Sequence, residues 1–355
     1  MRHAQTMNRI RGKRRLLSRG VAVAVATVAV VAAAACSSSS SSSAGSSAAS
    51  GSSASDASSG LTTVKLAVLP PSTGDAFMPI YASEDLGIAQ KLGIKFQFVQ
   101  VESGSAMLTA VLAGSADFAM LPVPTAAEAI YGGSKIQMFA PSGPGGAGFY
   151  LLVKAGSGIT NIQQLKGKSI GISAAGSETA DFAAYTSAKY DLNAKLVPVG
   201  FTGIQPALLS GKIDAGIIEA PQSYQLLASK QAVALANYGT LTPLTFAWTA
   251  RTGYADANKA IASKVLEAWY GAIAEMQKDP SLGYKELQKI NDEPASEAKQ
   301  EFQYGFAKAP TSGALTAGWI NDAYTLVKAA GVTRLPAASS LVSNDFASVT
   351  ASTSG

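Results

Sequence analysis

Asn161–Thr179 (NIQQLKGKSIGISAAGSET) holds the residue types best suited to bind a small polar group. Within it, Lys168–Ser173 predicts a buried strand and Ala174–Ser177 a glycine-serine loop. Glu178–Leu192 then predicts a helix whose N-terminus is capped by the last serine of that loop. The first N–H groups of a helix lack partners within the helix and form a cluster of hydrogen-bond donors. Since ligands of open α/β sheets bind beyond the carboxyl ends of the strands, this segment predicts one wall of a binding crevice.

This sequence has few side chains suited to covalent catalysis or to metal binding. The only histidine is His3 and the only cysteine is Cys36, and both fall in an N-terminal segment with the features of a signal. The rest of the chain therefore has no Ser-His or Cys-His pair, no His-ligated metal site and no internal disulfide. Acid–base chemistry by carboxylates or lysine stays open. The sequence nevertheless favours a binding protein without catalytic residues, cofactor or metal over an enzyme.

Residues 1–36 resemble an export signal. They contain a basic head and then the apolar run Gly20–Ala35, which is shorter than the ~20 residues that a membrane span requires. A short membrane anchor is the less favoured alternative. Ala33-Ala34-Ala35-Cys36 resembles a bacterial lipobox with Ala in place of the usual Leu, which implies that Cys36 carries a lipid and becomes the mature N-terminus. The pair Arg14-Arg15 leaves open whether export follows the general or the twin-arginine route.

Composition and charge separate this signal from the remainder. Residues 37–60 are almost wholly Ser, Ala and Gly, which predicts a flexible tether. The whole chain has 28 Lys and Arg against 23 Asp and Glu, but seven of these bases and none of the acids precede residue 37. The mature chain therefore has 21 bases against 23 acids, and nucleic acid is not an expected partner. About 295 residues follow the tether, which suits one large or two moderate domains.

Strands and helices alternate along this remainder. Val64–Leu69, Ile94–Val101 and Asp117–Leu121 predict strands, and helices begin at Asp75 and Met107 between them. Such alternation predicts an α/β fold with a mainly parallel sheet and helices on both faces.

A repeated phrase indicates two units of like construction. Ala110–Leu121 (AVLAGSADFAML) aligns with Ala207–Ile218 (ALLSGKIDAGII), and each ends a helix at Gly, turns at Asp and enters a strand. Each then reaches a proline at the same distance, Pro124 and Pro221, where a new helix is predicted. We expect two lobes, with coincidence between two α/β units of similar composition as the alternative.

Two segments predict crossings between these lobes. Pro141–Gly148 (PSGPGGAG) predicts a loop between strands Lys135–Ala140 and Phe149–Lys154. Its glycines match G-x-G-x-x-G, but that fingerprint must open a helix and here a strand follows, so no dinucleotide site is expected. Leu244–Ala250 (LTFAWTA) predicts the returning crossing.

The C-terminal part predicts mostly helix. Trp269 lies on the first of these helices, and we expect it to pack in the core, as aromatic residues at helical spacing usually do. A short tail, Leu341–Ala347, is expected to cover a lobe. The predicted helices are Asp256–Lys278, Pro280–Ile290, Ser296–Lys308 and Ala314–Ala330.

The order of these features resembles the solute-binding lipoproteins of ABC transporters for nitrate, taurine, alkanesulfonates and thiamine pyrimidines. The resemblance spans roughly residues 64–335, and its most specific phrases are Ala82–Ile94, Ala110–Asp117, Asn161–Ile172 and Ala207–Pro221. It implies the type II periplasmic binding protein fold, in which two α/β lobes joined by two hinge crossings close on a small molecule. Lobe I would comprise residues 61–148 and 250–345, and lobe II residues 149–249.

The resemblance also implies a place and partners for the protein. It would be a monomer, lipid-anchored to the outer face of the bacterial cell membrane, that delivers its ligand to a membrane permease. The loops that follow the lobe strands would form the site. On this sequence they are Ser72, Thr73, Asp75, Phe77, Gly104, Ser105, Pro122, Val123, Ser142, Gly143, Ala174, Gly176, Ser177, Glu178, Phe201, Thr202, Glu219, Phe246 and Trp248.

Several of these residues have an equally good structural interpretation. Four of the serines and threonines among them, Ser72, Thr73, Ser105 and Ser177, are suited to cap helices or form turns. Glu178 is also the kind of first-turn acid that the helix dipole favours. Asp117 and Asp214, outside the set, are expected to form turns rather than bind ligand.

The charges of the expected site indicate the class of ligand. Asp75, Glu178 and Glu219 are acids, and no Lys or Arg is among the expected site residues, so a buried anion would meet like charge. The sequence therefore favours a neutral or cationic heterocycle, such as an aminopyrimidine, over nitrate, taurine or an alkanesulfonate. Two other classes stay open: an enzyme of the same fold in thiamine-pyrimidine synthesis, which would rely on histidine and cysteine, and a surface sensor or scaffold without transport.

Overall fold

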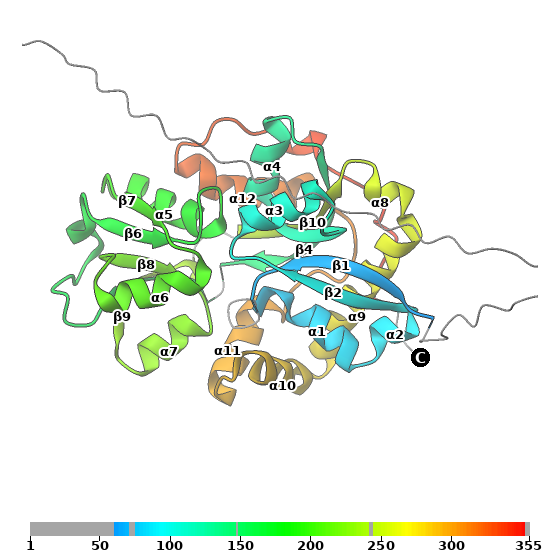
Figure 1. The fold of residues 1–355 in the computed structure, drawn as a ribbon, viewed down its shortest axis with the longest axis horizontal. Coiled ribbons are helices and arrows are strands. Elements are labelled where there is room, and N and C mark those ends of the chain that lie inside the picture. The colour runs from blue at the N-terminus through cyan, green and yellow to red at the C-terminus, as the bar shows by residue number, and fades with distance from the viewer. Residues whose placement is uncertain (1–59, 71–74, 147, 241–243, 352–355) are drawn as a thin grey trace, which may run out of the picture. The chain divides into compact units, whose positions relative to one another are not determined.

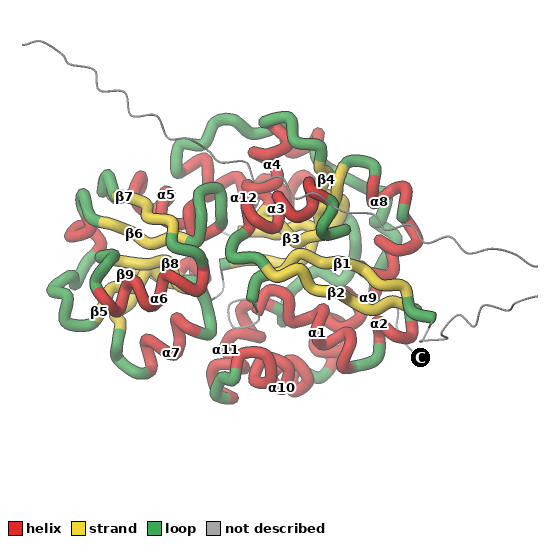
Figure 2. Tube along the Cα trace, in the orientation of Figure 1, coloured by secondary structure: helices red, strands yellow, loops and turns green. Residues whose placement is uncertain are grey.

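Two five-stranded sheets organise the chain, each with helices on both faces (Figure 1; Figure 2). The structure is a computed structural model that describes residues 60–70, 75–146, 148–240 and 244–351. The expected signal, the lipid-bearing Cys36, the tether and the site residues Ser72 and Thr73 lie outside the described residues. We call the part built on the first sheet lobe I and the part built on the second sheet lobe II.

The lobe I sheet has the strand order β2-β1-β3-β10-β4. Strands β1, β2 and β3 run parallel, whereas β10 is antiparallel to both of its neighbours. The α3 and α4 helices lie over one face of this sheet, and α1 and α9 over the other (Figure 1). The strands are β1 (Thr62–Val68), β2 (Ile94–Gln100), β3 (Phe118–Pro122), β4 (Ile136–Gly145) and β10 (Leu244–Arg251).

The lobe II sheet repeats this plan with the order β7-β6-β8-β5-β9. Strands β6, β7 and β8 are parallel, and β5 runs antiparallel between β8 and β9, just as β10 does in lobe I. The predicted pair of similar lobes is therefore confirmed. The strands are β5 (Tyr150–Lys154), β6 (Ser169–Ile172), β7 (Lys195–Pro198), β8 (Ala215–Ile218) and β9 (Ala232–Asn237).

The helices carry the rest of the chain. Those of lobe I are α1 (Met78–Asp85), α2 (Ile88–Lys91), α3 (Gly104–Ala113), α4 (Val123–Tyr131), α8 (Tyr254–Ala257), α9 (Lys259–Lys278), α10 (Pro280–Asn291), α11 (Ala295–Gly305) and α12 (Ala317–Ala329). Those of lobe II are α5 (Glu178–Lys189), α6 (Phe201–Ser210) and α7 (Gln222–Ala228). Short 3-10 turns are η2 (Asp75–Phe77), η3 (Ile162–Leu165), η4 (Tyr238–Thr240) and η5 (Ala338–Ser340). Among the described residues, no helix combines the length and hydropathy that crossing a membrane requires.

The repeated phrase forms the same structure in each lobe. It covers the end of α3 and β3 in lobe I, and the end of α6 and β8 in lobe II. Gly114 and Gly211 end these helices with φ of 76° and 75°, the left-handed conformation that glycine adopts readily. The carboxylate of Asp117 accepts the N–H of Lys65 at 2.9 Å, and that of Asp214 accepts the N–H of Ser169 at 2.9 Å. Asp117 therefore joins the start of β3 to β1, and Asp214 joins the start of β8 to β6, as the turn interpretation predicted.

The crossings differ from the predicted ones. Residues 141–145, expected in a loop, continue β4 and pair with β10. Leu244–Ala250, expected to cross between the lobes, lies instead inside the lobe I sheet as β10. The boundary drawn at residue 249 therefore assigned most of β10 to the wrong lobe. The apolar pattern of this segment was misleading, because a strand that connects two sheets and a strand in the centre of one sheet have the same pattern.

Two smaller findings concern the C-terminal part. The predicted helix Asp256–Lys278 is divided at Asn258 into α8 and α9. The expected covering role of the tail is confirmed, because Phe346 is fully buried with its ring 5.2 Å from that of Phe139 on β4.

Gly148, between β4 and β5 at the first crossing, packs closely against lobe II. Gly148 has φ of 73°, and a Cβ added there would lie 2.6 Å from the Cβ of Ala220. Its carbonyl oxygen accepts a 2.7 Å hydrogen bond from the hydroxyl of Ser223 on α7. The next residue, Phe149, packs on Phe182 at 5.2 Å between ring centres. These contacts leave room only for glycine at residue 148.

We expect Gly148→Ala to destabilise the protein by about 3 kcal/mol, because positive φ and a steric overlap both oppose the new methyl group. The free energy of unfolding in urea measures this loss. Gly158→Ala is the matched control, since Gly158 has φ of 79° but no atom within 4 Å of an added Cβ. The control should cost about 1 kcal/mol. Equal losses in the two variants would contradict the close approach.

Candidate functional site

A pocket lies between the two lobes. Both lobes contribute to its wall. Lobe I supplies Leu69, Ala76, Phe77, Met107, Met120, Ser142, Gly143, Gly145, Phe246, Trp269, Gly305 and Phe306. Gly146 of the first crossing is added to these, and lobe II supplies Phe149, Glu178 and Glu219. The pocket follows from the sheets, since β1 and β8 end beside it and the residues just after them, Leu69 and Glu219, line it.

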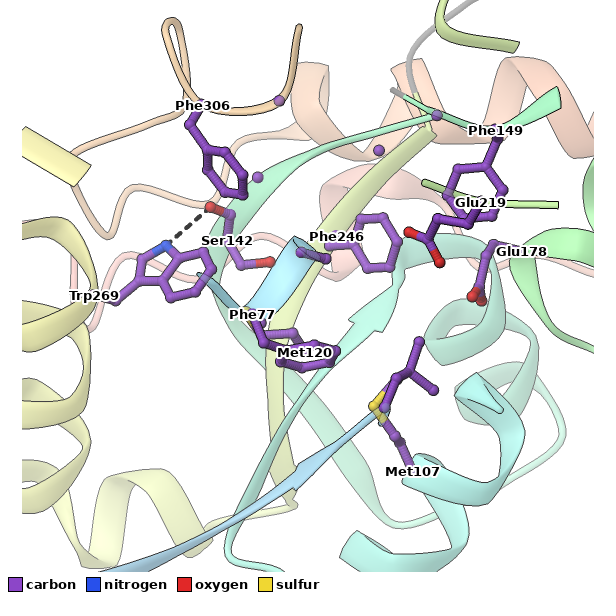
Figure 3. Close-up of a pocket in the computed structure, with 16 residues that line it drawn as sticks. Phe77, Met107, Met120, Ser142, Phe149, Glu178, Glu219, Phe246, Trp269 and Phe306 are labelled. Carbon is purple, nitrogen blue, oxygen red and sulfur yellow. Dashed lines mark hydrogen bonds between the residues drawn. The ribbon is translucent and has the colours of Figure 1, made fainter. Parts of the chain in front are cut away.

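Aromatic rings and thioethers form most of the wall (Figure 3). Phe246 and Met120 come from the neighbouring strands β10 and β3, and Phe77 ends η2. Trp269, in the middle of α9, is held by two contacts. Its Nε1 donates to the carbonyl oxygen of Ser142 at 3.0 Å, and its ring packs edge-on against Trp248 at 5.5 Å. Such a wall suits a flat or apolar body.

Three polar side chains face this apolar wall. The hydroxyl of Ser142 is buried and has no hydrogen-bond partner among the described residues. The carboxylates of Glu178 and Glu219 both point into the pocket from lobe II (Figure 3). No Lys or Arg of the described chain lines it. The pocket therefore offers negative charge and an alcohol to a ligand, and no compensating positive charge.

Burial makes the charge of Glu178 costly. The residue is only 1% exposed, and its Oε2 has no hydrogen-bond partner within the described part of the chain. Desolvation raises the pKa of this carboxyl to about 7. One turn further along α5, burial and then the charges of Glu128 and Glu178 raise the pKa of Asp181 well above its usual value. The junction of the lobes thus carries a group of buried acids.

The two lobes are in contact around the pocket. Thr202, in the first turn of α6, donates its hydroxyl to the carboxylate of Glu102 from lobe I at 3.0 Å. The hydroxyl of Thr125 on α4 donates to the carbonyl oxygen of Gly176 in lobe II at 3.0 Å. On α3, a Cβ added to Gly104 would lie 3.1 Å from Oε2 of Glu178. The two lobes therefore contact each other in this structure.

The structure brings six of the expected site residues to the pocket wall, namely Phe77, Ser142, Gly143, Glu178, Glu219 and Phe246. Phe201 and Thr202 line a smaller neighbouring pocket of about 300 Å³, which also includes Glu219. Asp75 begins η2, and Gly104 contacts Glu178 from lobe I. Ligand contacts by all these residues stay predictions.

Other expected residues lie away from the wall. Ser177 is fully buried and caps α5, with its hydroxyl donating to the carbonyl oxygen of Ala174 at 2.7 Å. Ser105 faces Ser103, which is the residue that caps α3. Trp248 packs behind Trp269. Ala174, Gly176, Pro122 and Val123 are likewise absent from the wall. The capping interpretation of Ser177 is thus confirmed, and Ser105 does not cap.

Sequence reasoning missed much of the apolar wall. Met107 and Met120 lie on elements that were predicted, but nothing in their spacing distinguishes a pocket side chain from a core side chain. Trp269 was expected in the core; it is 1% exposed and also lines the pocket. Phe306 follows α11, whose position relative to the sheets has no sequence signal.

Comparisons with known proteins agree with this architecture. The family model described as NMT1/THI5 like matches residues 75–282, which is more than half of the chain. None of the curated proteins matches the chain.

Solved structures share the fold. A protein from Bordetella bronchiseptica RB50 is 23% identical with a TM-score of 0.66, covering 78% of this chain and 91% of that one. The alkanesulfonate-binding protein SsuA from Xanthomonas axonopodis pv. citri, bound to MOPS, is 18% identical with a TM-score of 0.65, covering 78% and 96%. The Candida albicans CA3427 gene product, which has the generic periplasmic binding protein fold, is 16% identical with a TM-score of 0.66, covering 82% and 97%. The predicted periplasmic binding protein fold is therefore confirmed.

The buried acid makes a prediction about stability. Because Glu178 binds its proton more tightly in the folded state, stability is highest below its unfolded pKa of 4.5 and falls as the pH rises to about 7. Over this pH range, Glu178 should lower the free energy of unfolding by about 3 kcal/mol. Glu178→Gln should remove that part of the slope in urea unfolding measured from pH 4 to pH 8.

Asp191→Asn is the control for this experiment. It also removes one carboxylate, but the Asp191 side chain is 93% exposed, so the wild-type slope should remain. An unchanged slope in Glu178→Gln would show that this carboxyl is not desolvated.

Proposed function

The chain belongs to the NMT1/THI5-like family, and we propose that it is the solute-binding component of an ABC importer. It captures a small organic molecule between its lobes and delivers it to a membrane permease. The observation that carries this proposal is the pocket enclosed by two contacting lobes, which are joined by crossing segments. Lobes of this kind separate and close about their crossings, so ligand capture and permease docking are coupled through one movement.

The favoured ligand is a neutral or cationic heterocycle, such as an aminopyrimidine. The rings of Phe77, Phe246 and Trp269 would pack against its flat body. Glu219 would accept a hydrogen bond from an amino group or a ring N–H. A sulfonate or nitrate ion, the alternative, would be buried beside Glu178 and Glu219 with no Lys or Arg of the described wall to pair with it.

We further propose that the N-terminal signal places the protein outside the cytoplasm. Cys36 would carry the lipid that anchors it to the outer face of the bacterial cell membrane, and residues 37–60 would form the tether. The binding lobes would act as a monomer, with the permease as the protein partner and no role for nucleic acid. A tether of this composition leaves the lobes free to reach the permease.

An enzyme of the same fold is the other class to consider. No His follows residue 3 and no Cys follows residue 36, so the usual nucleophile and base pairs are absent from the sequence of both lobes. A ligand that is bound and released unchanged is therefore the expected behaviour.

A ligand screen with the full chain tests this function. Aminopyrimidines, organic amines, alkanesulfonates and nitrate are compared by thermal shift, and hits are followed by calorimetry and small-angle scattering. A ligand at 100 times its Kd should stabilise the protein by about 2.7 kcal/mol. Turnover of a bound compound would contradict the binding function, as would the absence of any stabilising compound across these classes.

Glu219→Gln tests the proposed hydrogen bond to the ligand. Loss of the charged acceptor should weaken a ligand that carries amino or ring N–H donors by about 10- to 100-fold in calorimetry. Asp191→Asn serves again as the exposed control and should leave the affinity unchanged. If Glu219→Gln binds such ligands as tightly as the wild type, the residue does not have this role.

A further inference from the structure

Glu178 has a position that its role as a first-turn acid does not explain. It begins α5 in lobe II, yet its Oε2 approaches Gly104, the first residue of α3 in lobe I. A Cβ added to Gly104 would lie 3.1 Å from Oε2 of Glu178, which is closer than most Cβ contacts in proteins. A side chain at this position would therefore press on the carboxylate. Residues of both lobes therefore lie close to the Glu178 carboxylate.

The carboxylate also points into the ligand space, and one of its two oxygens has no hydrogen-bond partner among the described residues. Glu178 is 1% exposed, its Oε2 has no hydrogen-bond partner among the described residues, and it points into the pocket (Figure 3). A buried polar atom of this kind is rare in a folded protein, because it has lost its water without gaining a hydrogen bond. A hydrogen-bond donor on the ligand would supply the missing partner of this oxygen.

The charges around Glu178 are of its own sign. Asp181 on α5 and Glu128 on α4 act on each other through space, and Glu219 after β8 shares the pocket. The α12 helix packs against α5, but its Lys328 places its ammonium over the ring of Tyr324 at 5.3 Å. Arg251 is engaged by the carbonyl oxygens of Val111 and Ala116. Among the described residues, Glu178 forms no ion pair with a Lys or Arg.

The aromatic wall favours the same kind of ligand. Phe149 from lobe II and Phe77 and Phe246 from lobe I line the same pocket as this carboxylate (Figure 3). The faces of aromatic rings attract cations, and they do so most strongly where water is excluded. An anion would be repelled by the rings and by both carboxylates, and a neutral ligand would leave the charge of Glu178 without compensation.

We propose that Glu178 selects ligands by charge: the lobes close stably over an organic cation, whose positive group pairs with this carboxylate, and reject neutral and anionic molecules of the same shape. This inference rests on the proposed solute-binding function and narrows its ligand class to cations. We expect closure of the lobes to apply this selection, because Gly104 of lobe I approaches the carboxylate so closely that an added Cβ would lie 3.1 Å from its Oε2.

Three probes of matched shape test the proposal: benzylammonium, benzyl alcohol and phenylmethanesulfonate. Each carries the same ring and methylene, with a positive, neutral or negative head. With the full-length wild type at pH 8, calorimetry should show benzylammonium binding about 10- to 100-fold more tightly than benzyl alcohol, and no binding of the sulfonate. Small-angle scattering should show compaction with benzylammonium alone.

Two variants assign the preference to Glu178. Glu178→Gln keeps the shape of the side chain and should remove most of the preference for benzylammonium over benzyl alcohol, with Glu219 retaining the remainder. Glu128→Gln is the matched control, because it removes one charge from the same group of acids without lining the pocket. It should keep at least most of the wild-type preference. Circular dichroism and thermal unfolding verify that both variants are folded.

The outcomes separate this inference from the function on which it rests. If benzyl alcohol or the sulfonate binds and compacts the wild type as well as benzylammonium does, the protein remains a solute receptor and charge selection by Glu178 is overturned. The same conclusion follows if Glu178→Gln keeps the preference, or if benzylammonium fails to bind while a neutral or anionic compound of the ligand screen succeeds. If no compound of the screen or of this set binds, the solute-binding function itself fails.

Discussion

The uncompensated carboxylate of Glu178 is the constraint that links the pocket to the arrangement of the lobes. Helix α5 presents it from lobe II, and Gly104 of lobe I covers it. In this structure Glu178 is 1% exposed, and residues of both lobes surround it. The free energy of bringing the lobes together therefore includes the cost of removing water from a charge, and the contents of the pocket decide whether that cost is recovered.

Attractive contacts oppose this cost at the same junction. Glu102 of lobe I accepts a hydrogen bond from Thr202 in the first turn of α6, a helix whose own cap residue is Gly200 and supplies no side chain. An acidic group near a helix N-terminus is favourable there, although exposure limits its contribution. The contact of Thr125 with Gly176 adds a second bridge. This arrangement of the lobes thus results from modest attractive contacts set against one buried charge.

The fold and the ligand are decided by different residues. The shared strand order of the two sheets depends on strands, on turns such as those of Asp117 and Asp214, and on the close packing of Gly148. This framework is what the chain shares with solved structures that are at most 23% identical to it. The pocket depends on a few side chains at the ends of those elements, which vary without altering the framework.

The sequence by itself determined the α/β class, the two similar lobes and most helices and strands. Local spacing carries that information, and the repeated Gly-Asp-strand-Pro phrase carried the duplication. Its charges also singled out Glu178 and Glu219. It misplaced β10, because a central strand and a crossing strand have the same apolar pattern.

Only the tertiary structure decided which side chains meet at the pocket. Ser177 has a residue type suited to a site, yet its hydroxyl is used within its own loop. Met107, Met120 and Trp269 look like core residues, yet they line the wall. Sequence spacing specifies the face of an element on which a side chain lies. Whether that face meets a neighbouring element or an open space depends on how distant segments pack, and no local pattern records it.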